Sequence, residues 1–176
     1  FTNDFLPAQT TTIIEYRATL ASLPRTQAYA EAPDTPDSEL IVPGSYTANP
    51  LDAGTGTVLG ADVPTFLRQT VAGGAITVYD SLGNEVNVQM RWAKTDSAAT
   101  GGTDTWELFY LENSNAGNAA VAWRNAGQVY SFNASGILSP NIPAVTLTGL
   151  TVNGVTIGDV VLSHGSSGVT QFADAN

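Results

Sequence analysis

The stretch GGAITVYDSLGNEVNVQMRW, residues 73–92, limits the possible folds of this chain more than any other segment. Apolar and polar residues alternate on both sides of a break at DSLGN, with Ile76 and Val78 on one side and Val88 and Trp92 on the other. A period of two places one set of side chains on a buried face and the other set in water. The stretch therefore predicts two antiparallel strands.

The break between these strands has the residues of a tight turn. Asp80 and Ser81 have side chains that accept hydrogen bonds from backbone N–H groups ahead of them, and Gly83 tolerates the left-handed conformation. We expect these three residues to turn the chain and to carry no chemistry.

Other segments extend the same pattern. TIIEYRATL, residues 12–20, predicts one strand, and TWELFYLEN, residues 105–113, is apolar on both faces, which predicts a strand covered on both sides. Residues 118–138 predict two strands around turns at NAG and NASG, and Asn153-Gly154 predicts a type I′ hairpin within residues 145–164. The predicted fold class is all-β, an antiparallel β-sandwich or barrel-like domain with long irregular loops.

A long segment interrupts this pattern. Residues 28–62 are rich in Pro, Asp, Ser, Thr and Gly, which predicts an irregular excursion with at most short extended pieces such as ELIV and TVL. For the next segment, VPTFLRQTVAGG, periodicity leaves a short helical turn and a strand equally open.

Composition excludes several classes of function. The 16 acidic and 6 basic residues give a formal net charge of −10, the wrong sign for binding nucleic acid or an anionic membrane. The chain has no cysteine, which removes disulfides, thiolate metal sites and cysteine nucleophiles. No segment approaches the ~18 apolar residues of a membrane helix. Because the chain begins at Phe1 instead of Met, we expect a processed protein or an excised fragment.

The single histidine, His164, is the one candidate for catalysis. Near it in the sequence lie Ser163, Ser166, Ser167 and Asp159. A Ser-His-Asp site requires three groups that converge in space, whereas neighbouring residues on one strand point to alternate faces. We expect a histidine at a strand end, and we assign no catalytic and no cofactor-binding residue.

Two further groups of residues have a functional and a structural interpretation. The carboxylates of Glu31, Asp34, Asp37 and Glu39 could bind calcium, but prolines break their spacing, which matches no calcium loop; a solvated acidic loop is favoured and no metal ligand is assigned. Three tryptophans could line a sugar-binding face, although their place in alternating strands favours burial in the core. They are Trp92, Trp106 and Trp123.

Four segments in a fixed order resemble one known family. They are ITVYDSLGNEVNVQMRWAKT, TWELFY, VYSFNASGIL and LTVNGVTIGDVVLSHGSSGVTQFADAN, and the leading IIEYRATLASLP is similar to the family's usual approach to this region. The set resembles the outer part of bacterial flagellar hook proteins. The resemblance covers half to two-thirds of the chain and leaves residues 28–72 unmatched.

The resemblance implies a structural role without enzymatic activity. Hook subunits form a curved, hollow extracellular tube, a universal joint between rod and filament, so the implied partners are other copies of the same subunit in a helical tubular polymer. It implies that residues 1–11 connect from a neighbouring domain, that residues 12–165 form an outer β domain with the Pro-rich excursion at about 28–72, and that residues 166–176 return to the neighbouring domain.

The chain also departs from the family pattern. Hook proteins often carry a histidine just after the hairpin turn, where this chain has Val86, so no role is assigned to such a histidine. The family's polymerising terminal helices are missing from both ends. We therefore expect an excised middle part of a subunit that is monomeric by itself.

Two other hypotheses come from different classes of protein. The alternative is an extracellular carbohydrate-binding or adhesive β-sandwich module that uses exposed Trp or Tyr side chains. The remaining one is a hydrolase with His164 as its anchor.

Overall fold

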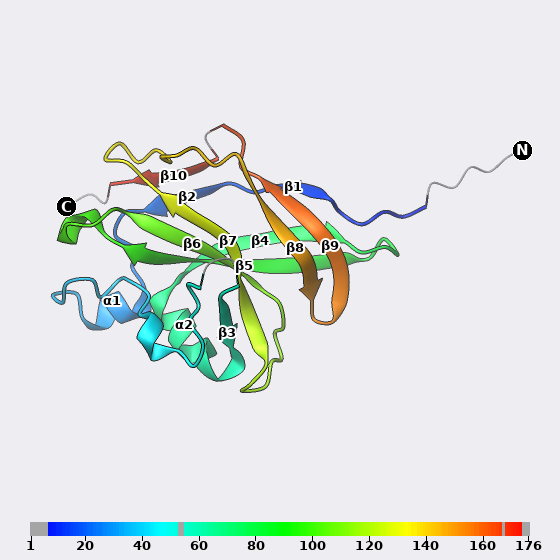
Figure 1. The fold of residues 1–176 in the computed structure, drawn as a ribbon, viewed down its shortest axis with the longest axis horizontal. Coiled ribbons are helices and arrows are strands. Elements are labelled where there is room, and N and C mark those ends of the chain that lie inside the picture. The colour runs from blue at the N-terminus through cyan, green and yellow to red at the C-terminus, as the bar shows by residue number, and fades with distance from the viewer. Residues whose placement is uncertain (1–6, 53–54, 167, 174–176) are drawn as a thin grey trace, which may run out of the picture.

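The computed structural model describes residues 7–52, 55–166 and 168–173, and its strands form three sheets (Figure 1). The strand orders are β3-β7-β6-β5-β4, β1-β9-β8 and β10-β2. The elements are β1 (Ile13–Glu15), β2 (Ala18–Ala21), α1 (Gln27–Glu31), η1 (Pro43–Ser45), β3 (Thr57–Leu59), η2 (Gly60–Asp62), α2 (Val63–Gln69), β4 (Val71–Tyr79), β5 (Glu85–Asp96), η3 (Ala98–Thr100), β6 (Thr105–Leu111), β7 (Val121–Ser131), β8 (Ala144–Val152), β9 (Val155–Ser163) and β10 (Val169–Phe172). The all-β sandwich class is confirmed.

The predicted hairpin is confirmed as the β4–β5 pair, in which Val78 lies opposite Val86. The Asp80 Oδ1 atom accepts hydrogen bonds of 2.9 Å from the backbone N–H groups of Leu82 and Asn84. Gly83 has a φ of 82°, the left-handed conformation that the turn requires.

This facing of the hairpin leads to a first prediction. Val88 is fully buried whereas Asn87 is exposed, so Val88→Asp should lower the free energy of unfolding by at least the roughly 1.5–3 kcal/mol that burial of a valine contributes. Asn87→Asp changes an exposed side chain and should have little effect. Urea unfolding of the two variants measures the difference, and comparable losses would refute the assigned facing.

The β4 strand, at the edge of the five-stranded sheet, contains a β-bulge. Its register shifts between Ala72 and Ala75, and Gly74 there has a φ of 73°. A side chain at Gly73 would collide with the Tyr16 hydroxyl, 2.8 Å from the Cβ position. The bulge therefore lets Tyr16 approach the backbone of β4 closely.

The main core lies between the five-stranded sheet and the β8–β9 hairpin, which crosses it in Figure 1. Alternate residues of β5 and β6 face this core, as the period of two predicts. Its largest fully buried side chains include Trp92, Trp106, Tyr110 and Tyr130. The Asn153-Gly154 turn is confirmed between β8 and β9, since both residues have positive φ angles, 48° and 81°.

A second core covers the opposite face of the five-stranded sheet. Phe109 of β6 and Trp123 of β7 pack there against Phe66 of α2, with ring centroids 5.1 and 5.2 Å from that of Phe66. The central strand β6 is therefore covered on both sides, as its sequence predicts. No helix in the described ranges is long and apolar enough to cross a membrane.

The excursion at residues 28–62 is more ordered than predicted. TVL is the strand β3, but ELIV forms no strand, and the segment begins within α1, in residues 27–31. The segment VPTFLRQTVAGG begins with the helix α2 and continues into β4. The seven residues of α2 bury Phe66 alone, so the helix has too little apolar periodicity for its sequence to reveal it.

Two strand predictions were wrong in their continuity. Residues 12–20 cover two strands, β1 and the start of β2, because the chain leaves the β1-β9-β8 sheet at Tyr16, whose side chain is buried. The NAG triplet is a bulge within one strand, β7, where Gly127 has a φ of 87° and its N–H donates to the Asn125 Oδ1 atom at 2.8 Å.

The first and last strands pair in parallel, which the antiparallel prediction missed. β1 pairs with β9 over three residues, and β2 pairs with β10 over four. Residues 7–12 lie at one end of the long axis and the end of β10 lies at the other (Figure 1). Thr11 contacts the β4 edge, since its N–H donates to the Tyr79 carbonyl at 3.0 Å.

Candidate functional site

His164 lies just after β9, as expected for a strand end, and it is 1% exposed. Its Nδ1 atom lies 2.8 Å from the Tyr16 backbone carbonyl, and its Nε2 atom lies 2.7 Å from the Tyr130 hydroxyl. A carbonyl only accepts, so Nδ1 carries the proton, and in the neutral ring Nε2 accepts from Tyr130. Both ring nitrogens therefore have partners, and neither partner is a serine or a carboxylate.

The other residues of the hypothetical triad have different surroundings. The Asp159 Oδ1 atom accepts from the Gly149 N–H at 2.8 Å, and the Ser163 carbonyl accepts from the Tyr16 N–H at 2.8 Å. Ser166 is exposed in the loop after β9, and Ser167 lies outside the described residues. The absence of a catalytic residue stays a prediction.

Burial lowers the pKa of His164 below its ordinary value of 6.5, and the hydrogen bond to the Tyr16 carbonyl opposes this effect. The folded protein therefore holds the neutral ring at pH values where the unfolded chain binds a proton. Through its two contacts, His164 joins the end of β9 to Tyr16 and to Tyr130 of β7.

This lowered pKa leads to a prediction on stability. The contribution of His164 should be complete above about pH 6.5 and should decrease as the pH falls below that value, because the unfolded chain then binds a proton that the folded protein does not, with a slope of at most ~1.4 kcal/mol per pH unit. Urea unfolding at pH 7.5 and 5.5 measures the loss.

The matched variant is His164→Asn, which keeps a polar side chain but cannot titrate. Burial also raises the pKa of Glu107, so the contribution of Glu107 to stability decreases as the pH rises. This contribution is the same in both proteins, so the difference between them reports on His164 alone. An identical pH dependence in both proteins would contradict the assignment.

A buried network surrounds this histidine. The Tyr16 hydroxyl donates to the Gly73 carbonyl at 2.7 Å and accepts from the Trp92 Nε1 atom at 2.9 Å, and burial raises the pKa of Tyr16 to about 12. The Trp92 and Tyr130 rings are in edge-to-face contact, with centroids 4.8 Å apart. These contacts fix the point where the chain passes from β1 to β2.

A second buried network contains an ion pair. Lys94, at the far end of β5, is 2% exposed, and its Nζ atom lies 3.1 Å from the Asp104 Oδ1 atom. The same amine donates to the Ser22 carbonyl, just after β2. The Gln171 side chain in β10 donates to Asp104 at 2.9 Å and accepts from the Trp106 Nε1 atom at 2.9 Å. This network joins β10 and the end of β2 to the five-stranded sheet.

The acidic segment has no converging carboxylates. Glu31 pairs with Arg68 of α2, and Asp37 accepts from the Thr100 hydroxyl at 2.7 Å. Asp34 is exposed and Glu39 is buried. Across residues 7–52, 55–166 and 168–173, no three His, Cys, Asp or Glu side chains lie close enough to hold a metal ion.

The three tryptophans are buried, none more than 4% exposed, as the alternation predicts. The three tryptophans are therefore not available to line a sugar-binding face, as the alternative hypothesis requires. Among the residues that the structure describes, two exposed aromatic rings are Tyr79 at the end of β4, 43% exposed, and Phe172 at the end of β10, 50% exposed.

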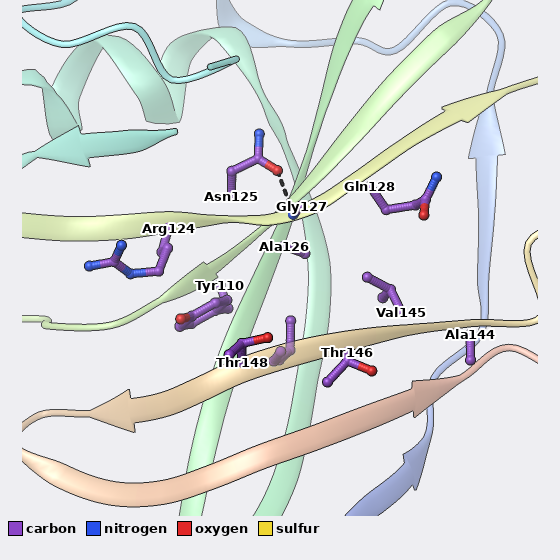
Figure 2. A pocket seen from close by; sticks show the side chains of 11 residues that line it. Tyr110, Arg124, Asn125, Ala126, Gly127, Gln128, Ala144, Val145, Thr146 and Thr148 are labelled. Atoms are coloured by element: carbon purple, nitrogen blue, oxygen red, sulfur yellow. Dashed lines mark hydrogen bonds between the residues drawn. The ribbon is translucent and has the colours of Figure 1, made fainter. Parts of the chain in front are cut away.

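An open pocket of about 410 Å³ lies between the edges of β7 and β8 (Figure 2). Its charged residue, Arg124, is held by Glu112, with two nitrogen–oxygen distances of 3.1 Å. The eleven lining residues offer hydroxyl, amide and backbone groups but no nucleophile beside a base. They are Tyr110, Arg124, Asn125, Ala126, Gly127, Gln128, Ala144, Val145, Thr146, Leu147 and Thr148.

Sequence reasoning missed Lys94, Tyr16 and Tyr130 as members of buried networks. The alternation along β5 does indicate the burial of Lys94, because Lys94 is an even number of residues from Val88 and Trp92 and therefore lies on the same, buried face of the strand. The other two contacts depend on strands that are distant in the sequence, and no local pattern indicates them.

Comparison with known proteins places these observations in a family. The family model described as "Flagellar basal body protein FlaE D2 domain" matches residues 62–176, which include α2 and the strands from β4 to β10. No curated protein matches the chain. Members of this family are structural parts of the flagellar hook, whose subunits polymerise, and it is not an enzyme family. The chain belongs to the FlaE D2 domain family and is a structural part of a flagellar hook protein.

Proposed function

We propose that this chain is an outer domain of the hook subunit, located outside the cell, where neighbouring copies slide against each other as the hook bends and acts as a universal joint between rod and filament. The family match over residues 62–176 carries the proposal. The fold supports it, because both faces of the five-stranded sheet are already covered and the domain needs no partner to complete its core.

The surface suits contacts that form and break. The net charge of −10 makes neighbouring copies repel weakly, and only 12% of the residues are charged, so Thr, Ser, Asn and Gly supply much of the remaining surface. Small polar interfaces have low affinity and exchange readily. We propose that nucleic acid and membranes are not partners of this domain.

The proposed division of the chain follows the sequence. Residues 12–165 form the outer β domain, with the excursion at 28–72 as its helical cover, and residues 1–11 and 166–176 connect it to a neighbouring domain. Within the C-terminal segment, Val169–Phe172 form β10, which pairs with β2. Sedimentation of the isolated chain should give the mass of a monomer, and a tight oligomer would count against this division.

Cysteine labelling tests the location, because the chain contains no cysteine of its own. Leu82→Cys and Ala134→Cys place a thiol at two exposed turns, and Val78→Cys places one at a fully buried position of the same hairpin as Leu82. Each variant is expressed within its native subunit in the bacterium that makes it, and intact swimming cells are treated with a maleimide dye that does not cross membranes.

The expected result is a labelled hook on cells with either exposed cysteine and no label with Val78→Cys. Label that enters only after lysis would contradict an extracellular position. Label on the filament or cell body instead of the hook would contradict the hook assignment.

Reversible cross-linking tests the sliding motion. A cleavable bis-maleimide added to hooks with Ala134→Cys is expected to stop swimming where it links neighbouring copies in pairs, which run as dimers on a gel, and cleavage of the linker should restore swimming. Cross-linked hooks that still bend and drive swimming normally would refute sliding at this surface.

A further inference from the structure

The terminal strands have an arrangement that determines how the domain responds to tension. β2 and β10 are parallel neighbours over four residue pairs, and β1 and β9 are parallel neighbours over three. The chain approaches β1 from one end of the long axis, where residues 7–12 lie, and β10 ends near the other (Figure 1). Pulling the two ends apart therefore pulls β2 and β10 in opposite directions along their common axis.

The direction of pulling decides how the hydrogen bonds between two strands break. Force along the strands loads all the bonds of the pair together, so they must break in one event. Force across the strands at one end loads one bond at a time, so the hydrogen bonds of the pair break one after another from that end. Unfolding under force is governed by the barrier to unfolding, so the first arrangement resists much larger forces.

Backbone bonds continue the two parallel pairs across the junction between them. The Tyr16 N–H donates to Ser163 at 2.8 Å and the Ala18 N–H donates to Gly168 at 2.8 Å, on either side of the break between β1 and β2. The Tyr16 side chain is itself fixed by Gly73 and Trp92. A pull on the N-terminal end is thereby transmitted to β9 as well as to β10.

Side chains hold the pair at its other end. Lys94 binds the Ser22 carbonyl just after β2, and Gln171 of β10 binds both Asp104 and Trp106. These partners belong to β5, β6 and the loop between them, in the five-stranded sheet. Neither strand of the pair can slide without breaking contacts to the main core.

We infer that the parallel pairs β1–β9 and β2–β10 form a mechanical clamp, which keeps the domain folded when its two ends are pulled in opposite directions. The inference concerns the fold itself and does not depend on the proposed location or on sliding between subunits. It gives the domain a second property, resistance to tension along its long axis.

Single-molecule pulling of the 176-residue chain tests the clamp. One variant carries Ala8→Cys and Ala173→Cys, so force acts end to end; a second carries Gln27→Cys and Ala173→Cys, so force opens β2 and β10 from the same end. All three positions are exposed. We expect an unfolding force about twofold or more higher for end-to-end pulling, because the bonds of the parallel pair then break together.

Equal unfolding forces in the two directions would overturn the inference, and this comparison needs no destabilising substitution. Gln171→Leu in the end-to-end variant should lower the unfolding force, whereas Gln89→Leu, at an exposed position of β5, should leave it unchanged. An end-to-end force that Gln171→Leu leaves unchanged would contradict the role of the side-chain network in the clamp.

Discussion

Replacement of Trp106 by alanine is expected to lower the free energy of unfolding by about 3–5 kcal/mol, the range typical of a large buried aromatic side chain. Trp106 is fully buried in β6, and its Nε1 atom donates to Gln171 in β10 at 2.9 Å. The substitution removes apolar contacts in the main core, leaves a cavity, and deprives Gln171 of a buried partner. Urea unfolding followed by circular dichroism measures the loss.

The matched control is Trp106→Phe, which keeps most of the ring but removes the N–H donor. We expect Trp106→Phe to lower the free energy of unfolding clearly less than Trp106→Ala, because phenylalanine leaves a smaller cavity. The lost hydrogen bond alone should account for about 1 kcal/mol. If Trp106→Ala unfolded at nearly the same urea concentration as the native sequence, the burial assigned to β6 would be wrong.

Replacement of Lys94 by methionine is expected to lower the free energy of unfolding by about 3 kcal/mol, because it removes the cation from a buried ion pair and leaves the Asp104 carboxylate without it. Burial by itself raises the pKa of Asp104, but hydrogen bonds from Ala98, Gln171 and Lys94 and the charge of Lys94 lower it overall. The Asp104 side chain is 16% exposed, which places the expected loss at the lower end of the range for buried pairs.

A double-mutant cycle separates the ion pair from the loss of packing. Asp104→Asn removes the carboxylate charge, so Lys94→Met should cost less in that background than in the native sequence. A coupling energy near zero would show that the two side chains contribute independently. Thermal unfolding at two salt concentrations provides a second measurement, because a buried pair is screened less than exposed charges.

The sequence predicts best those parts of the fold that depend on neighbouring residues. The β4–β5 hairpin combines a period of two with a turn closed by Asp80 and Gly83, and all of these residues lie within one short segment. Asn153-Gly154 specifies its own turn in the same way. The class of the domain follows, because strands with such turns have few other arrangements.

Features that depend on distant residues were not predicted. The parallel pairing of β1 with β9 joins positions almost 150 residues apart, and the break at Tyr16 exists because its side chain is buried against Gly73 and Trp92. Helix α2 is short and buries Phe66 alone, so its apolar pattern is too brief to identify. Tertiary contacts determine all three.

The residues around His164 show the same limit. Its position at a strand end follows from the local pattern, but its partners Tyr16 and Tyr130 come from other strands. The interpretation of the tryptophans as core residues needed only their alternation and agrees with their burial. The burial of Lys94 follows from the alternation along β5, because Lys94 lies on the same face of the strand as Val88 and Trp92.

The bulge in β4 has a consequence for how copies of this domain meet. An edge strand with a straight, free backbone can accept a strand from another molecule, which leads to fixed backbone pairing or aggregation. The kink at Gly73–Gly74 interrupts that edge, and the Thr11 N–H occupies the Tyr79 carbonyl farther along it. This edge therefore offers a strand from another copy no straight, uninterrupted backbone with which to pair.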